Sequence, residues 1–456
     1  ISAGAITLIG GASGIENTAM LFGAGGQTIT TGSLTLTGGA DGGGFSDGNR
    51  AYVGSNANQV LNIANALAIQ GGGGNLSDNA AQIEQLGLTG AQTFNLGANA
   101  SVALLGGSSA GTNVGGTGHG SRASIYSAGT SQSLLFGVNG SLTLVGGTLG
   151  SRNFAQVFAE NTGNQTIAGN PDIVLQGGSS GGVAGEGNSA YIATNAGSQN
   201  IAAASITLTA GAGGTENFAQ ISQGAAANGN SQSISIAASG ALALQGGGGA
   251  GNFARVRSSG VSQQLAFGAG STLDLTGGTG ASNNFARVQA VVGNQTISGN
   301  PDITLQGGAS GGADLQGNFA DIRANGASAL QNIAAGNLTV LAGAAGQENF
   351  AGVFGANQTI HALGDVSLTG GGSATSLDGT SGGGARIGGL GGASPSATNL
   401  SLTLGGDLSM TGGSVAGAAL GSSLAGGQPT TIVVTAVGDI SLNGGGTPAS
   451  GARIGS

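Results

Sequence analysis

The sequence predicts an all-β protein, a right-handed parallel β-helix (β-solenoid) with three short strands per coil of about 33 residues and about 13 coils. Three observations lead to this prediction: internal repeats with a common period, strand-like alternation within each repeated segment, and glycine pairs at a fixed place in each repeat. A period of about 20–50 residues is typical of solenoids and propellers. Parallel crossover connections favour the right-handed coil.

The clearest repeat is an apolar-x-apolar-x-Gly-Gly string, which defines the Leu-type strand. Examples are LTLTGG from Leu34, LTLVGG from Leu142 and ITLQGG from Ile303. Between Ile6 and Ile440 the strings repeat at intervals that average about 33 residues. The glycine pairs suit the corners of a coil, because glycine tolerates positive φ and close backbone approach.

Two further repeats share this period. The Gln-type strand carries Gln-x-apolar, and we expect its amides to stack along the axis as in cross-β structures; its glutamines are Gln27, Gln59, Gln92, Gln132, Gln165, Gln199, Gln232, Gln263, Gln295, Gln331 and Gln358. The Ala-type strand carries Ala-x-apolar, often after Asn-Phe, with its alanine at Ala155, Ala219, Ala254, Ala286, Ala320, Ala351, Ala385 and Ala452. Alternation of two residues is typical of strands.

The main alternative is a β-propeller, whose blades have about 40–45 residues and four strands. Only three strands are visible in each period, so the solenoid is favoured. The glycine pairs are not phosphate-binding loops, because such a loop needs a following helix and a lysine. Neither feature is present in the sequence.

The repeats divide the chain into regular coils over 1–365, with Gln and Ala-x-Ile ladders, and divergent continuing coils over 366–456. The segments 164–182 and 294–312 differ at only three positions, which is consistent with duplication of a four-coil block. The chain starts in a Gln-type strand and stops in an Ala-type strand. Since these strands are consecutive in a coil, we expect the stack to continue end to end or within a longer chain.

Composition excludes several functional classes. The net charge of -9 argues against a general nucleic-acid partner, which requires a surplus of cations. No apolar run reaches the roughly 18 residues of a membrane span. The chain has no cysteine, hence no disulfide and no thiolate metal site. The sequence predicts no cofactor and no metal site.

All nine cations are arginines, and they lie on or within three residues of the Ala-type strand. The functional interpretation is a stripe that contacts an anionic partner, such as an acidic polysaccharide; its residues are Arg255, Arg257, Arg287, Arg323, Arg386 and Arg453. The structural interpretation, which we favour from sequence, is an exposed, solvated face that discourages aggregation. The first outward position of the Leu-type strand is almost uncharged, which favours lateral packing, with ice binding a minor alternative.

Catalysis finds little support, and the sequence predicts no enzyme. The two histidines, His119 and His361, lie in different coils without a repeated carboxylate neighbour. Glycoside hydrolysis needs two acids about 5–10 Å apart. Asp274 and Asp302 are the nearest to such a pair, but one lies within a strand and the other in a turn.

The Leu-type strings, as in GSLTLTGG from Gly32 and GSLTLVGG from Gly140, and the Gln-Thr-Ile strings resemble the repeats of filamentous haemagglutinin-like exoproteins of the two-partner secretion family. The resemblance spans nearly the whole chain. It implies a secreted or bacterial cell-surface protein that acts in adhesion, biofilm or matrix. From the uncharged face and the open strand edges we expect self-association into a filament or bundle, and from the arginine stripe a cell-surface or matrix polysaccharide as a partner. The alternatives are a carbohydrate- or ice-binding module and a polysaccharide-degrading β-helix enzyme.

Overall fold

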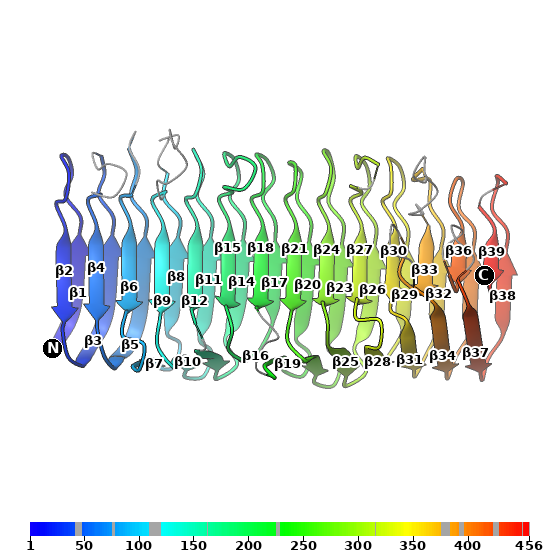
Figure 1. Cartoon of the computed structure of the whole chain (residues 1–456), viewed down its shortest axis with the longest axis horizontal. Helices are drawn as coiled ribbons and strands as arrows, with labels where there is room; N and C mark the ends of the chain where they lie inside the picture. The colour runs from blue at the N-terminus through cyan, green and yellow to red at the C-terminus, as the bar shows by residue number, and fades with distance from the viewer. Residues whose placement is uncertain are drawn as a thin grey trace. The chain divides into compact units, whose positions relative to one another are not determined.

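A computed structural model of the chain contains parallel strands and, among the described residues, no helix. It describes residues 1–41, 48–74, 78–108, 120–161, 163–224, 229–314, 316–374, 384–391, 396–422, 428–448 and 450–455. The chain divides into two compact units, Ile1–Asn230 and Ser231–Ser456. Each unit is a parallel β-solenoid, as the repeats predict, and strands of one type follow one another along it (Figure 1).

Unit 1 contains three series of strands. Its Ala-type strands are β2 (Ala19–Gly23), β4 (Ala51–Ser55), β6 (Ala81–Gln85), β9 (Ala123–Ser127), β12 (Ala155–Ala159), β15 (Ala190–Thr194) and β18 (Ala219–Gln223). Its Gln-type strands are β7 (Ala91–Leu96), β10 (Ser131–Phe136), β13 (Asn164–Ala168) and β16 (Gln199–Ala203). Its Leu-type strands are β1 (Ser2–Ile9), β8 (Ser101–Leu105), β11 (Ser141–Val145), β14 (Asp172–Gln176) and β17 (Ile206–Thr209).

Three strands of unit 1 differ from the expected three per coil, because β1, β3 (Gln27–Thr37) and β5 (Gln59–Gln70) each join a Gln-type to a Leu-type segment. No glycine or proline interrupts β5, so the backbone stays extended through it. In the coil of β13 and β14, by contrast, Gly169 and Asn170 have φ of 98° and 53°, and Pro171 follows them. This local turn separates the two strands.

Unit 2 repeats the same order. Its Gln-type strands are β19 (Ser231–Ile236), β22 (Ser262–Phe267), β25 (Asn294–Ser298), β28 (Leu330–Ala335), β31 (Asn357–Ala362), β34 (Thr398–Leu404) and β37 (Thr430–Ala436). Its Leu-type strands are β20 (Ala241–Gln245), β23 (Thr272–Thr276), β26 (Asp302–Gln306), β29 (Leu338–Leu341), β32 (Val366–Thr369), β35 (Leu408–Thr411) and β38 (Ile440–Asn443). Its Ala-type strands are β21 (Ala254–Ser258), β24 (Ala286–Ala290), β27 (Ala320–Ala324), β30 (Ala351–Phe354), β33 (Ala385–Gly388), β36 (Ala418–Leu420) and β39 (Ala452–Ile454).

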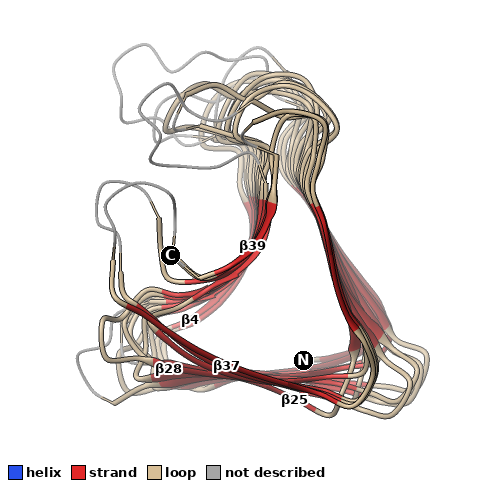
Figure 2. Cartoon of the chain, turned by 90° about the vertical axis from the view of Figure 1, so that its right-hand side faces the viewer, coloured by secondary structure: helices blue, strands red, loops and turns tan. Residues whose placement is uncertain are grey.

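Within each unit the register places equivalent residues of successive coils side by side. Gln92 lies opposite Gln132, and Leu142 lies opposite Val102. Viewed end-on, the three strand types form three sides of the coil (Figure 2). Outside the terminal coils, the alternate apolar residues of the strands are buried between these sides. The core therefore consists of stacked Leu, Ile, Val and Ala side chains, and each coil depends on its neighbours to bury them.

The second glycine of each pair permits close stacking of the corners. A Cβ atom on Gly178 would lie 2.2 Å from the carbonyl oxygen of Gly147 in the preceding coil. The backbone N–H of Gly178 donates a hydrogen bond of 2.6 Å to the carbonyl oxygen of Asn188. Any larger residue would force adjacent coils apart at this corner.

Candidate binding face on the Ala-type strands

The glutamines of the Gln-type strands form a buried ladder of amides inside each unit. In unit 1 the Nε2 of Gln165 donates to the Oε1 of Gln132 at 2.8 Å, and the Nε2 of Gln199 donates to Gln165 at 2.8 Å. In unit 2 the same bond of 2.7–2.8 Å links each glutamine to the preceding one, from Gln358 through Gln331, Gln295 and Gln263 to Gln232. These residues lie in the interior, so their role is structural.

A second ladder was not anticipated from the sequence, although the Asn-Phe-Ala strings contain it. The Oδ1 of each buried asparagine accepts the backbone N–H of the equivalent residue one coil earlier. Asn318 is typical: it accepts from the backbone of Asn284 at 2.9 Å and donates from Nδ2 to the carbonyl oxygens of Ala281 and Ser310. The asparagines therefore fix the corner at which the Ala-type strand begins.

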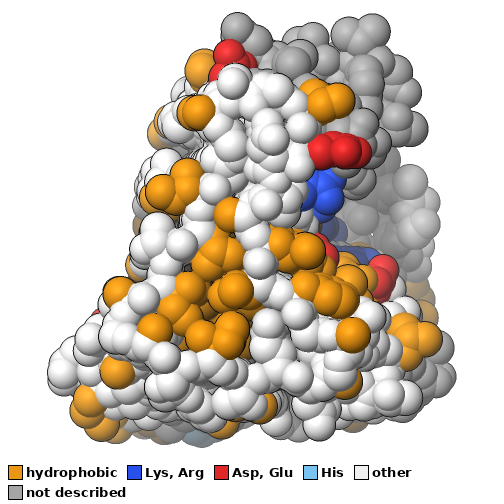
Figure 3. All heavy atoms as spheres, turned by 90° about the vertical axis from the view of Figure 1, so that its left-hand side faces the viewer, with side chains coloured by type: hydrophobic (Ala, Val, Ile, Leu, Met, Phe, Trp, Pro, Cys, Tyr) orange, Lys and Arg blue, Asp and Glu red, His pale blue; other side chains and the backbone are white. Residues whose placement is uncertain are grey.

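The outward face of the Ala-type strands collects the charged and aromatic side chains. The strand alanines point inward and are buried, so the residues before them and one and three positions after them point outward. Unit 1 is hollowed on the side where arginine side chains lie (Figure 3). The prediction that these positions are exposed is wrong for Gln82, Ser124, Gln156 and Asp321, which are buried because they pack into this inward-curving face.

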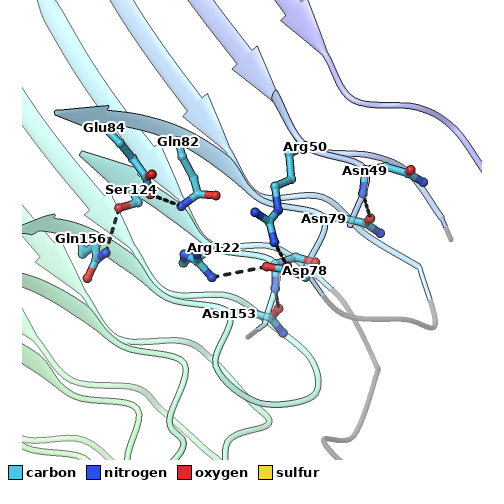
Figure 4. A network of polar contacts seen from close by, with 11 residues as sticks. Asn49, Arg50, Asp78, Asn79, Gln82, Glu84, Arg122, Ser124, Asn153 and Gln156 are labelled. Carbon is cyan, nitrogen blue, oxygen red and sulfur yellow. Dashed lines mark hydrogen bonds and ion pairs between the residues drawn. The ribbon is translucent and has the colours of Figure 1, made fainter. Parts of the chain in front are cut away.

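In unit 1 a buried carboxylate organises part of this face. Asp78 has no exposed surface and forms ion pairs with Arg50 and Arg122 (Figure 4). The Arg122 Nη1 lies 3.4 Å from the Asp78 Oδ1. Burial lowers the pKa of Arg122, and the charge of Asp78 opposes this shift. The ion pairs therefore compensate a buried carboxylate and leave no free acid at Asp78.

Glu84 lies on the same face, beside Tyr52 and Gln82. The Gln82 Nε2 donates to the Glu84 Oε1 at 2.5 Å. Burial raises the pKa of Glu84, and burial together with the charge of Glu84 raises the pKa of Tyr52. A carboxyl with a raised pKa suits proton transfer, but hydrolysis also needs a second available carboxylate. Here the neighbouring acid Asp78 is held by two arginines, so the arrangement is that of a packed polar network.

In unit 2 the same face is a stack of phenylalanines overlain by arginines. The rings of Phe253, Phe285, Phe319 and Phe350 lie nearly parallel, with centroids 4.9, 5.0 and 4.6 Å apart. The Arg255 guanidinium lies 4.7 Å from the Phe253 centroid. The Arg287 guanidinium lies 4.7 Å from Phe285 and 4.5 Å from Phe319. Cation–π contacts and stacking hold these arginines in place.

One carboxylate lies within this arginine row. Asp321, which has no exposed surface, accepts from the Nε and Nη2 of Arg287 at 2.7 and 3.0 Å and from the Nε of Arg323 at 2.8 Å. The side chains of Arg287 and Arg323 remain 13% and 20% exposed. The two guanidinium groups therefore form a fork-shaped site for a carboxylate that the chain itself fills in this coil.

The remaining arginines of the predicted stripe lie along the same face and are half-buried. Burial, followed by the charges of Arg257 and Arg287, lowers the pKa of Arg255 to about 9. Burial, followed by Arg323 and Arg453, lowers the pKa of Arg386 to about 9. Both guanidinium groups stay charged at neutral pH, in a row where positive charge is in excess.

The residues considered for catalysis are not brought into such a site. His361 is exposed, and His119 lies outside the described residues. Asp274 accepts from the Thr272 hydroxyl, and Asp302 accepts from the backbone and side-chain N–H groups of Asn337. No group of three His, Asp or Glu side chains that could hold a metal ion occurs in the described part of the chain. The same residues include no helix long and apolar enough to cross a membrane.

Comparisons with protein-family models, curated proteins and solved structures yield no match for this chain.

Proposed function

We propose that the protein is an extracellular structural element that forms a rod or filament in adhesion, biofilm or matrix, through side-by-side and end-to-end packing. The proposal assigns it no enzymatic role. Its secretion and cell-surface location follow from the resemblance of its repeats to filamentous haemagglutinin-like exoproteins. The observation that carries the proposal is the outer face of the Leu-type strands.

That face is a continuous column of small, uncharged side chains in unit 1. The first outward position is occupied by Thr7, Thr35, Ala68, Ala103, Thr143, Val174 and Thr207. Thr7, Val174 and Thr207 are exposed. On β8, Leu105 lies two positions after Ala103 and is 39% exposed. Asp172, two positions before Val174 on β14, is an exposed charge on this face. Since solvated sheets usually carry many charges to prevent association, a face whose first outward position is uncharged in every coil of unit 1 supports packing against a like surface.

Sedimentation velocity over a range of concentrations tests side-by-side packing. Thr207→Arg places a charge within the uncharged column. Asn200→Arg places one at an exposed position of the Gln-type strand in the same coil. Burying an unpaired arginine between two molecules should weaken association by about tenfold or more. The proposal expects this only for Thr207→Arg. Equal effects of the two variants, or no association of the wild type, contradict it.

A carbohydrate-binding module is the second candidate, and the arginine row of unit 2 favours it over ice binding. Ice-binding surfaces are uncharged arrays, and this row is charged. The arrangement of the arginines in this row also indicates the chemical class of the ligand.

A further inference from the structure

The outward positions of the unit 2 Ala-type strands carry six arginines and, among the described residues, a single carboxylate. The arginines are Arg255, Arg257, Arg287, Arg323, Arg386 and Arg453, and the carboxylate is Asp321. An excess of cations concentrated on one face of a chain whose net charge is -9 must be offset by an anionic partner or by counter-ions.

The register makes this row a regular array along the solenoid axis. At the first position after the strand alanine, Arg255 lies opposite Arg287, which lies opposite Asp321. At the third position after it, Gln289 lies opposite Arg323. Parallel strands are spaced about 4.8 Å apart. Neighbouring charged side chains of the row lie on strands that are one or two such spacings apart. A partner with anions at a similar repeat can contact several arginines at once.

Asp321 shows which anion the array accommodates. Its two oxygens bind the Nε and Nη2 of Arg287 in the paired geometry of a carboxylate and a guanidinium. In the coil of β33 the Nη1 of Arg386 donates to the carbonyl oxygens of Gly389 and Gly421, and its guanidinium lies 4.6 Å from the Phe354 ring. Among the described residues, which leave out 375–383, no carboxylate forms an ion pair with Arg386. Burial, followed by the charges of Arg323 and Arg453, lowers the pKa of Arg386.

The arginines are also preorganised. Phe354 lies between two guanidinium groups, 5.7 Å from Arg323 and 4.6 Å from Arg386, and the phenylalanine stack supports Arg255 and Arg287. Side chains held in this way lose little conformational entropy when a ligand binds. The ring edges add an apolar floor beside the charges, a combination that suits a sugar ring bearing a carboxylate.

We propose that the arginine row of unit 2, from Arg255 to Arg453, binds an extended carboxylated polysaccharide that lies parallel to the solenoid axis. The ligand class is a polyuronate, which carries one carboxylate on each sugar. The inference rests on the proposed extracellular role for the setting in which such a polymer is met. A single extended chain fits an inward-curving face of half-buried arginines better than the broad flank of a second protein molecule does.

Binding of fluorescently labelled oligogalacturonate, followed by anisotropy at concentrations below self-association, tests the assignment. The variants are Arg287→Gln, Arg386→Gln and their combination, and the control is Arg152→Gln, which removes an arginine paired with Glu186 in unit 1. Arg386→Gln should weaken binding by about tenfold, because a charge-assisted hydrogen bond to the ligand is lost. Arg287→Gln should weaken it by a similar factor, because Asp321 then loses a paired cation and its charge repels the ligand. The control should bind as the wild type does, and uncharged maltooligosaccharide should not bind.

Asp321→Asn is a second test variant, for which tighter binding is expected. A variant that fails to fold would bind less, so misfolding cannot produce this result. Removing the internal carboxylate releases the forks of Arg287 and Arg323 for the ligand, so oligogalacturonate should bind more tightly. Unchanged or weaker binding by this variant contradicts the inference.

Two other results also overturn it: no binding by the wild type, or equal binding by the double variant and the control. If the double variant instead loses self-association while its oligogalacturonate binding is unchanged, the partner is a second copy of the chain. Thr207→Arg separates this site from the proposed assembly, because it should disrupt packing and leave oligogalacturonate binding intact.

Discussion

The glutamine ladder of unit 2 allows the same substitution to be compared in the middle and at the end of one structure. Gln295 donates to Gln263 and accepts from Gln331, both at 2.7 Å. Gln295→Leu therefore leaves the Oε1 of Gln263 and the Nε2 of Gln331 buried without these partners. Each orphaned polar group costs about 1–3 kcal/mol, so the variant should lose about 2–6 kcal/mol of the free energy of unfolding.

Gln358 ends the ladder, because Leu400 occupies the equivalent position in the next coil. Among the described residues its buried Oε1 has no hydrogen-bond partner. Gln358→Leu removes this unsatisfied oxygen but orphans the Oε1 of Gln331, so the number of unsatisfied acceptors is unchanged. The free energy of unfolding should change by less than about 1 kcal/mol.

Urea unfolding measures both values, and hydrogen exchange of β22–β28 shows whether the loss is local, since repeat arrays need not unfold in one step. A loss below about 1 kcal/mol for Gln295→Leu, or equal losses for the two variants, would refute the role assigned to the ladder.

Two further substitutions test the corners and the polar network. Gly178→Ala should lower the free energy of unfolding in urea by at least about 2 kcal/mol, because its Cβ atom would meet the Gly147 carbonyl oxygen. Gly25→Ala is the control and should change this free energy little, because no atom lies within 4 Å of the added Cβ atom. Similar losses for the two variants would contradict the stacking argument. Glu84 has a raised pKa, so its contribution to stability is present at low pH and is lost as the pH rises above its ordinary value of 4.5. Glu84→Gln should therefore raise the melting temperature at pH 7 and flatten its decline with pH; a lower melting temperature at pH 7 would count against this assignment.

The repeats in the sequence sufficed to predict the coil, because each ladder residue recurs at a fixed place relative to alternating apolar residues. Gln165 and Leu142 could be assigned in this way. The asparagine ladder had an equally regular signal, at Asn284 and Asn318 among others, but its partners are backbone N–H groups. Such partners become visible only when the coils are stacked.

The surroundings of the outward positions were harder to predict. Alternation places Asp321 on the outer side, yet it is buried, because the face curves inward and Arg287 of the neighbouring strand and Arg323 of its own strand cover it. The continuous strand β5 was likewise missed, since its Gln-type and Leu-type segments were expected to be separated by a turn. Both features depend on the path of the backbone between repeats, which the period does not specify.

Cryo-electron microscopy of the protein at high concentration tests the proposed assembly most directly. The proposal predicts molecules packed side by side, with Thr143, Val174 and Thr207 of one molecule against the Leu-type strands of another. Dispersed single molecules, or contacts made through the Ala-type strands instead, would contradict it.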